Sequence, residues 1–246
     1  MGGLKGRERQ SKLTSASEKD KSWEVLGKTN LQKTKWLNAF ELKHTPFVDA
    51  VFTTLRNKDT KTAEFATATH DISMLLVGEA LNLVPYRAES ITTPLNARIA
   101  GLRMSTQICG VPIIRAGLPM ADALRSYMPS ATIGHVVIQR DERTAKPKFL
   151  LDKLPNLRSD LTVILLDPML ATGGSALAAI EHVLQKGVSE KQIMFTNIIS
   201  CPEGISAVTK RHPQVTLVTG WIDKGLNKIA YIVPGLGDFG DRYWGT

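Results

Sequence analysis

The fold is decided by one stretch of the chain, Val163-Ile164-Leu165-Leu166-Asp167-Pro168-Met169-Leu170-Ala171-Thr172-Gly173-Gly174-Ser175. It joins an apolar strand to an acid and then to a loop of small residues, and a helix-forming run at 176–186 follows at once. Glycines let the backbone approach an anion closely, and the first amides of the helix point towards it. The hydroxyls of Thr172 and Ser175 add further donors. This strand–loop–helix junction is typical of a phosphate site at the carboxyl end of a parallel strand.

The acid and the missing lysine narrow the kind of phosphate ligand. Asp167 stands at the end of the strand, where a carboxylate can hold sugar hydroxyls or a metal-bound water. The loop lacks the lysine of a Walker P-loop, which argues against an ordinary ATPase or GTPase. A phosphate held beside sugar hydroxyls indicates a sugar-phosphate substrate. The alternative is that Gly173-Gly174 is only a tight turn before a helix.

Strands and helices alternate from residue 108 onward, which predicts a mainly parallel, twisted α/β sheet flanked by helices. The expected strands are 108–114, 132–138, 148–154, 161–166, 192–200 and 215–222. The expected helices among them are 117–128, 176–186 and 202–212, and Gly187 is expected to cap the C-terminus of the second. Upstream, Thr45-Pro46 begins a helix with a capping hydroxyl and a proline in the first turn, and a longer helix is expected at 62–83.

The net charge of +8 is concentrated near the N-terminus. Residues 1–40 hold nine Lys or Arg against four acids, so they carry +5 and leave +3 for the rest. We expect a basic, flexible extension at 1–40 and one large domain at 41–246. The alternative for the extension is a short helix around 36–40 that covers a neighbouring subunit. A polyanionic small molecule is an adequate partner for the remaining charge, so we expect no nucleic-acid partner.

Composition also bounds the compartment. The apolar fraction of 43% suffices for a full core, and we see neither a run that would span a bilayer nor a secretory signal. Cys109 and Cys201 lie far apart in apolar runs and form no C-x-x-C motif. They predict buried, inert thiols in a reducing compartment, and we expect a cytoplasmic protein without membrane partners.

Two arginines stand where predicted strands end. Arg115 lies in Ile113-Ile114-Arg115-Ala116-Gly117 and Arg140 in Gln139-Arg140-Asp141-Glu142. A guanidinium binds phosphate oxygens in a fork, and strand ends open onto the cleft of such a sheet. The polar run 143–148 suggests a mobile cover, with an ordinary solvated loop as the alternative.

The C-terminal run Gly235-Leu236-Gly237-Asp238-Phe239-Gly240 matches the dinucleotide fingerprint G-x-G-x-x-G only literally. That fingerprint needs a βαβ unit of about 30 residues, whereas six residues follow Gly240 here. We interpret the run as a rigid loop whose main-chain groups contact a flat base.

Four segments together resemble one family. The phosphate loop resembles the phosphoribosyl-diphosphate loop of type I phosphoribosyltransferases, in the form found in uracil phosphoribosyltransferases. The arginine-containing segments and the C-terminal run 231–246 are similar to the same family, and the resemblance covers 42–246. It implies the type I phosphoribosyltransferase fold, with an N-terminal helical arm and a C-terminal base-binding loop. It also implies transfer of a phosphoribosyl group from 5-phosphoribosyl 1-diphosphate to uracil, giving UMP and pyrophosphate in pyrimidine salvage.

The resemblance implies a set of site residues. Phosphoribosyl diphosphate is expected to contact Arg115, Arg140, Asp167, Pro168, Met169, Leu170, Ala171, Thr172, Gly173, Gly174, Ser175 and Asp238. Uracil is expected to contact Ile232, Gly237, Asp238 and Phe239. Many purine-directed relatives carry two adjacent acids where this chain has Asp167-Pro168. Mg²⁺ is therefore expected to bind mostly through substrate oxygens, with Asp238 as a protein ligand.

Two further expectations concern regulation and assembly. Some members of the family are activated by GTP, and the basic turn Arg56-Lys58-Lys61 is our candidate GTP site, with a solvated corner as the alternative. The resemblance implies a homodimer or homotetramer, for which the apolar stripes of the long helices are candidate interfaces. An RNA-binding regulator and an inactive nucleotide-binding relative are the rival functions. The net charge of only +3 on residues 41–246 disfavours the RNA-binding regulator. The phosphate loop and the C-terminal base-binding loop are both intact, which disfavours the inactive relative.

Overall fold

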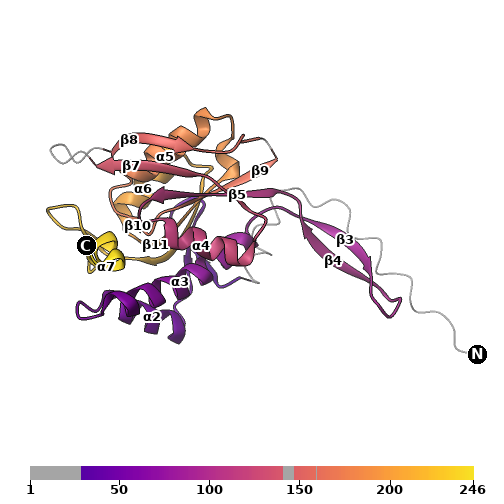
Figure 1. Ribbon diagram of the computed structural model, residues 1–246, viewed down its shortest axis with the longest axis horizontal. Coiled ribbons are helices and arrows are strands. Elements are labelled where there is room, and N and C mark those ends of the chain that lie inside the picture. The colour runs from indigo at the N-terminus through magenta and orange to yellow at the C-terminus, as the bar shows by residue number, and fades with distance from the viewer. Residues whose placement is uncertain (1–28, 141–146, 159) are drawn as a thin grey trace, which may run out of the picture.

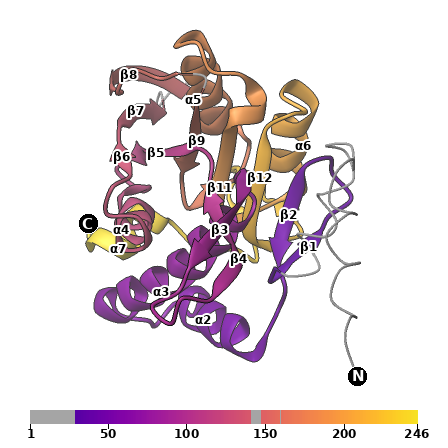
Figure 2. The same ribbon diagram turned by 90° about the vertical axis from the view of Figure 1, so that its right-hand side faces the viewer.

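A mixed sheet runs through the computed structural model, which describes residues 29–140, 147–158 and 160–246. Its strands follow the order β1-β2-β12-β11-β9-β5-β7-β8 (Figure 1 and Figure 2). The pairs from β2 to β7 are parallel, and the outermost strands β1 and β8 are antiparallel to their neighbours. These strands are β1 (Leu31–Lys33), β2 (Ala39–Leu42), β5 (Gln107–Ile114), β7 (His135–Arg140), β8 (Pro147–Lys153), β9 (Leu161–Leu166), β11 (Ile193–Ser200) and β12 (Thr216–Ile222). The short strands β6 (Thr132–Ile133) and β10 (Met169–Leu170) pair with β5 and β11.

Helices cover both faces of this sheet (Figure 2). They are α2 (Pro46–Arg56), α3 (Thr62–Asn82), α4 (Leu118–Tyr127), α5 (Gly174–Gln185) and α6 (Pro202–Arg211), with a 3₁₀ turn η1 (Glu190–Gln192). β9 is buried along its whole length, as parallel strands are when both faces are covered. Ile164 packs in the cluster under α2, α3 and α4, whereas Val163 and Leu165 pack under α5 and α6. The predicted mainly parallel sheet flanked by helices is confirmed.

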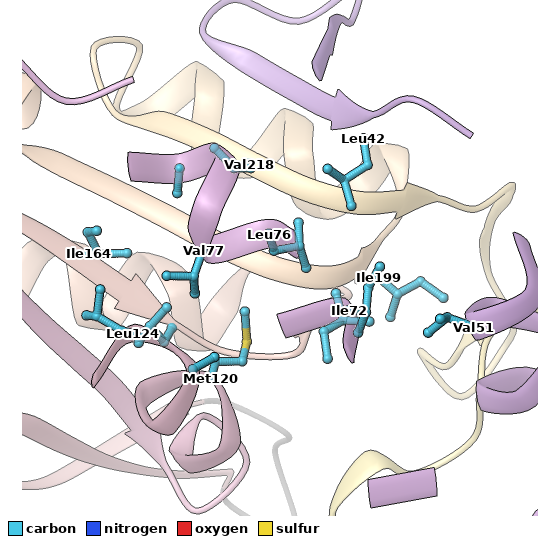
Figure 3. Packing of buried hydrophobic residues seen from close by; sticks show 14 of the residues in the cluster. Leu42, Val51, Ile72, Leu76, Val77, Met120, Leu124, Ile164, Ile199 and Val218 are labelled. Carbon is cyan, nitrogen blue, oxygen red and sulfur yellow. The ribbon is translucent and has the colours of Figure 1, made fainter. Parts of the chain in front are cut away.

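The first two helices are part of the core. Val77 of α3 lies close to Ile164 of β9 and Leu124 of α4, and all three are fully buried (Figure 3). The apolar stripes of α2 and α3 therefore pack against the chain's own sheet. Large exposed apolar side chains occur instead on the hairpin β3 (Tyr86–Thr92) and β4 (Arg98–Met104), which projects from the body (Figure 1).

Local signals in the sequence set two helix ends as expected. Thr45 caps α2 by accepting a hydrogen bond from the amide of Val48 at 3.4 Å. Gly187 follows α5 with φ of +99°, a conformation that glycine adopts without steric cost. Its amide donates to the carbonyl of Leu184 at 3.0 Å.

Residues 29–40 differ from the expected extension. β1 and β2 form a hairpin, and β2 adds to the sheet beside β12, across the boundary that we placed after residue 40. The alternative of a helix at 36–40 is wrong, because this segment is a turn leading into β2. The Trp36 indole donates to Ser206 Oγ of α6 at 2.8 Å, which fixes the turn. Residues 1–28 and most of the polar run 143–148 lie outside the described residues.

Among the residues that the structure describes, no helix combines the length and the apolar character needed to cross a membrane.

Two phenylalanines of α2 provide a matched test of this core. Phe52 is 1% exposed and contacts Trp221, whereas Phe47 is 55% exposed. We predict that Phe52→Ala lowers the free energy of unfolding by about 3–5 kcal/mol, because it leaves a cavity. Phe47→Ala should change it by less than about 1 kcal/mol. Urea denaturation measures both; equal losses would contradict this packing.

Candidate functional site

The turns that follow the parallel strands meet at one edge of the sheet. β5 and β9 pair in register up to Pro112 and Leu166, so the turn after β5 and the loop after β9 lie side by side. A cleft of about 360 Å³ opens there. It is lined by ten of the predicted site residues, Arg115, Asp167, Pro168, Met169, Ala171, Ser175, Ile232, Gly237, Asp238 and Phe239.

Two main-chain carbonyls of the phosphate loop, residues 167–175, accept hydrogen bonds from amides at and just after the end of β11. The carbonyl of Pro168 accepts from the amides of both Ile198 and Ile199 at 3.0 Å. The carbonyl of Leu170 accepts from the amide of Cys201 at 3.2 Å. These bonds tie the first part of the loop to the end of β11 and to the residue that follows it.

The end of the loop leads directly into α5. Gly173 has φ of +85° and offers no side chain to cap the helix, and the amide of Gly174 donates to Thr172 Oγ1 at 3.4 Å. The next amides of the first turn can face an anion, and the helix dipole favours negative charge there. Ser175, in this first turn, lines the cleft. Leu170, Thr172, Gly173 and Gly174 belong to the same loop but do not line the cleft itself.

α6 supports the phosphate loop; the helix itself was expected at 202–212, but its contact with the loop was not. A Cβ on Gly204 would lie 2.5 Å from the carbonyl oxygen of Ala171 and 2.6 Å from that of Leu170. The Cys201 thiol donates to the Ala171 carbonyl at 3.1 Å, and burial raises its pKa to about 11. Only a glycine lets the first turn of α6 approach so closely. The sequence signal was the glycine in the first turn of a predicted helix.

Arg115 occupies the turn between β5 and α4. The backbone of this turn lies against the end of β9: a Cβ added to Gly117 would fall 2.1 Å from the carbonyl oxygen of Leu166. The guanidinium is exposed, 5.8 Å from the ring centre of Trp244, and Nη2 lies 3.5 Å from Thr246 Oγ1. The cation is thus placed between the phosphate loop and the C-terminal residues. The Ile114–Arg115 peptide is cis.

The C-terminal run forms the opposite wall of the cleft. A two-stranded hairpin, β13 (Gly225–Leu226) and β14 (Ile232–Val233), is followed by a turn and by a short helix α7 (Phe239–Trp244). The helix was not predicted: Asp238 caps it by accepting from the amide of Asp241 at 3.0 Å. Phe239 is buried against Phe65, with ring centres 5.5 Å apart. This wall is therefore fixed to α3.

The other predicted site residues lie elsewhere. Arg140 ends β7, one strand beyond β5, and Ile138 of the same strand lines the cleft. Arg56 does not belong to an open basic turn: it forms a two-bond ion pair with Asp223, at 2.8 and 3.0 Å. Lys58 and Lys61 are exposed. Asp223 was missed, because its partner is 167 positions away in the chain.

Metal binding is constrained by the donor set. In the described segments, no three His, Cys, Asp or Glu side chains are grouped so that they could hold a metal ion. Asp167 and Asp238 both line the cleft. Mg²⁺ usually keeps few protein ligands when phosphates supply oxygens, so these two carboxylates fit a cation carried mostly by a substrate.

Comparisons with known proteins point to one family. The family model of uracil phosphoribosyltransferase matches residues 42–246. The chain is 44% identical to the uracil phosphoribosyltransferase of Dictyostelium discoideum, over 85% of this chain and 97% of that protein. It is similar to a solved structure of a protein from Aquifex aeolicus, with a TM-score of 0.74, 30% identity, and coverage of 85% and 98%. Adenine phosphoribosyltransferase of Trypanosoma brucei shares the fold, with a TM-score of 0.55, 14% identity, and coverage of 82% and 90%.

The contact between α6 and the loop can be tested with one methyl group. We predict that Gly204→Ala weakens binding of ribose 5-phosphate roughly 10- to 100-fold, because the methyl displaces the loop carbonyls from their positions. Alanine is the better helix former, so a loss cannot come from helix propensity. Calorimetric titration measures the affinity.

The control for this change is Gly101→Ala in the β3–β4 hairpin, where the nearest atom is 3.7 Å from the added methyl. This variant should bind ribose 5-phosphate with the same affinity as the unchanged protein. Full affinity in Gly204→Ala would show that the loop does not depend on this contact.

Proposed function

The chain belongs to the uracil phosphoribosyltransferase family, and we propose that it transfers the phosphoribosyl group of 5-phosphoribosyl 1-diphosphate to uracil. The bond from C1 of the ribose to the pyrophosphate oxygen breaks, and a bond from C1 to uracil N1 forms. Uracil N1 loses its proton, and the products are UMP and pyrophosphate. One observation carries the proposal: a single cleft is bordered on one side by a helix N-terminus and on the other by a rigid backbone wall.

The phosphate loop is proposed to hold the 5-phosphate of the ribose. Amides in the first turn of α5 and the Ser175 hydroxyl are proposed to supply donors without a lysine. Asp167 lines the cleft beside them and is proposed to accept from the ribose hydroxyls. Holding the ribose at both ends presents C1 to the attacking base in a fixed orientation, which lowers the entropic part of the barrier.

The leaving group requires positive charge. Arg115 is exposed in the cleft and is proposed to bind pyrophosphate oxygens in a fork. Arg140, at the end of the neighbouring strand β7, is proposed to bind the same substrate. Mg²⁺, when bound, would neutralise further charge on the diphosphate, with Asp238 or Asp167 as its protein ligands. A guanidinium placed before the reaction stabilises charge as it develops on the departing oxygen.

The C-terminal wall is proposed to recognise uracil. The base has an imide N–H and two carbonyls, and main-chain groups of Ile232, Gly237 and Phe239 can pair with them. Cytosine would leave a backbone group at position 4 unpaired, which penalises its binding. Burial of the base against this wall also excludes water, a competing nucleophile.

Regulation and assembly are separate proposals. GTP activation is proposed to act through the basic turn of Lys58 and Lys61 beside Arg56, and a GTP titration of the velocity tests it. A homo-oligomer is proposed, for which the projecting β3–β4 hairpin, with Leu95 and Leu102 strongly exposed, is the surface to test. The two free, buried cysteines support a reducing, cytoplasmic location.

The proposed reaction is tested with radiolabelled uracil. UMP should form only when phosphoribosyl diphosphate and Mg²⁺ are both present. We predict that Arg115→Ala lowers kcat about 10²- to 10³-fold, the usual cost of losing a group that stabilises transition-state charge. Arg125→Ala, an exposed arginine at the end of α4 outside the cleft, is the control. A wild-type rate in Arg115→Ala would refute its role, and absence of UMP in the unchanged protein would refute the reaction.

A further inference from the structure

The turn that carries Gly237 is fastened from behind by a charged pair outside the cleft. Both polar main-chain atoms of Gly235 are held. Its amide donates to Asp223 Oδ2 at 2.7 Å, and its carbonyl accepts from Arg56 Nη1 at 2.9 Å. The same two side chains bind each other through Nη1–Oδ2 at 3.0 Å and Nη2–Oδ1 at 2.8 Å. Two successive peptide units of the turn, 234–235 and 235–236, are thus held by one ion pair.

The surroundings make this network hard to break. The Asp223 side chain is 2% exposed, and Arg56 is 20% exposed. The guanidinium lies 5.3 Å from the ring centre of Phe52 and 5.1 Å from that of Trp221. In such a low-dielectric site the bonds are strong, and removing one partner leaves the other charge buried without compensation.

A second arginine, Arg242, binds the next peptide, 236–237, and also binds carbonyls at the C-terminal end of α2. Arg242 of α7 donates to the carbonyl of Leu236 and to the carbonyl of Asn57, both at 2.6 Å, and also to the carbonyl of Leu55. The carbonyls of Gly235 and Leu236 are therefore both bound to cations at the C-terminal end of α2. The following residues, Gly237 and Asp238, line the cleft.

Gly237 is the residue whose orientation this arrangement sets. It has φ of +81°, so the peptide that follows it can turn sharply relative to the bound peptides before it. If residues 235 and 236 rotated, the main-chain groups of Gly237 would point elsewhere without any change in the phosphate loop. The network thus acts on one wall of the cleft only.

We propose that Arg56 and Asp223 are positioning residues for uracil: they fix the 235–236 peptides so that Gly237 presents its main-chain groups to the base. The inference rests on the proposed transfer to uracil. Neither side chain is among the residues that line the cleft, which is why the role is one of positioning. Arg56 is in consequence a structural element of base recognition rather than a free cation of the basic turn.

The test separates the two substrates kinetically. Arg56→Met and Asp223→Asn are assayed for UMP formation, with KM measured for uracil and for phosphoribosyl diphosphate well below each variant's melting temperature. Arg56→Met should raise the KM for uracil roughly 10- to 100-fold, as expected for the loss of hydrogen bonds to charged groups. The KM for phosphoribosyl diphosphate should stay within about twofold, since the phosphate loop is untouched.

Two further variants distinguish positioning from general stability. Arg56→Lys keeps the cation but not the fork, and should recover part of the uracil affinity. The double variant Arg56→Met with Asp223→Asn removes both charges. Its loss of uracil affinity, expressed as a free energy, should be smaller than the sum of the losses in the two single variants, because the two residues act as one unit. Arg211→Met, which breaks an exposed pair with Glu181 at 2.8 Å, is the matched control and should leave both KM values unchanged.

The outcomes are distinct. A selective rise in the KM for uracil, with partial recovery in Arg56→Lys, supports the inference. An unchanged KM for uracil, or an equal rise in both KM values, overturns it while UMP formation by the unchanged protein upholds the proposed function. If the unchanged protein forms no UMP, the proposed function fails and takes the inference with it. If Arg56→Met does not fold, Asp223→Asn and Arg56→Lys decide by the same criterion.

Discussion

Parallel pairing of β5, β9 and β11 is the constraint on which the site depends. Each of these strands ends at the same edge of the sheet, so the turns that follow them must meet there, whatever their sequence. Burial of β9 on both faces fixes its register, because a shift by one residue would exchange the two hydrophobic clusters that it joins. The relative positions of Asp167 and Arg115 therefore follow from packing in the core.

Both walls of the cleft are built in the same way. In each wall, main-chain carbonyls are bound on the side away from the cleft. Amides of β11 bind the carbonyls of the phosphate loop, and Arg56 and Arg242 bind those of the C-terminal wall. A backbone fastened in this manner can present its remaining amides to a ligand without reorganising when the ligand binds. Such preorganisation suits a reaction in which charge separates at C1 of a ribose and water must be excluded.

The sequence allowed prediction of the parts whose signals are local. The apolar run 161–166, the cap at Thr45 and Gly187 after α5 each depend on neighbouring residues, and the structure agrees with all three. The phosphate loop was recognisable because its acid, hydroxyls and glycines are contiguous. Their assignment to particular substrate atoms stays a prediction.

The remaining parts depend on contacts between distant residues. β2 is a short strand between β1 and β12, and the polar stretch at 29–40 gave no sign of its pairing with β12. The β3–β4 hairpin has little buried surface, so it lacks the alternation that identifies a half-buried strand. The network of Arg56 and Asp223 joins residues 167 positions apart, and Arg56 in isolation was read as part of a basic turn. Folding gives these charges a role that their local sequence does not.

A crystal structure with UMP bound tests the central claim most directly. The account predicts that the phosphate of UMP accepts hydrogen bonds from amides at the start of α5, and that the uracil edge pairs with main-chain groups of Ile232, Gly237 or Phe239. A nucleotide bound outside this cleft, or a uracil held only by side chains, would contradict it.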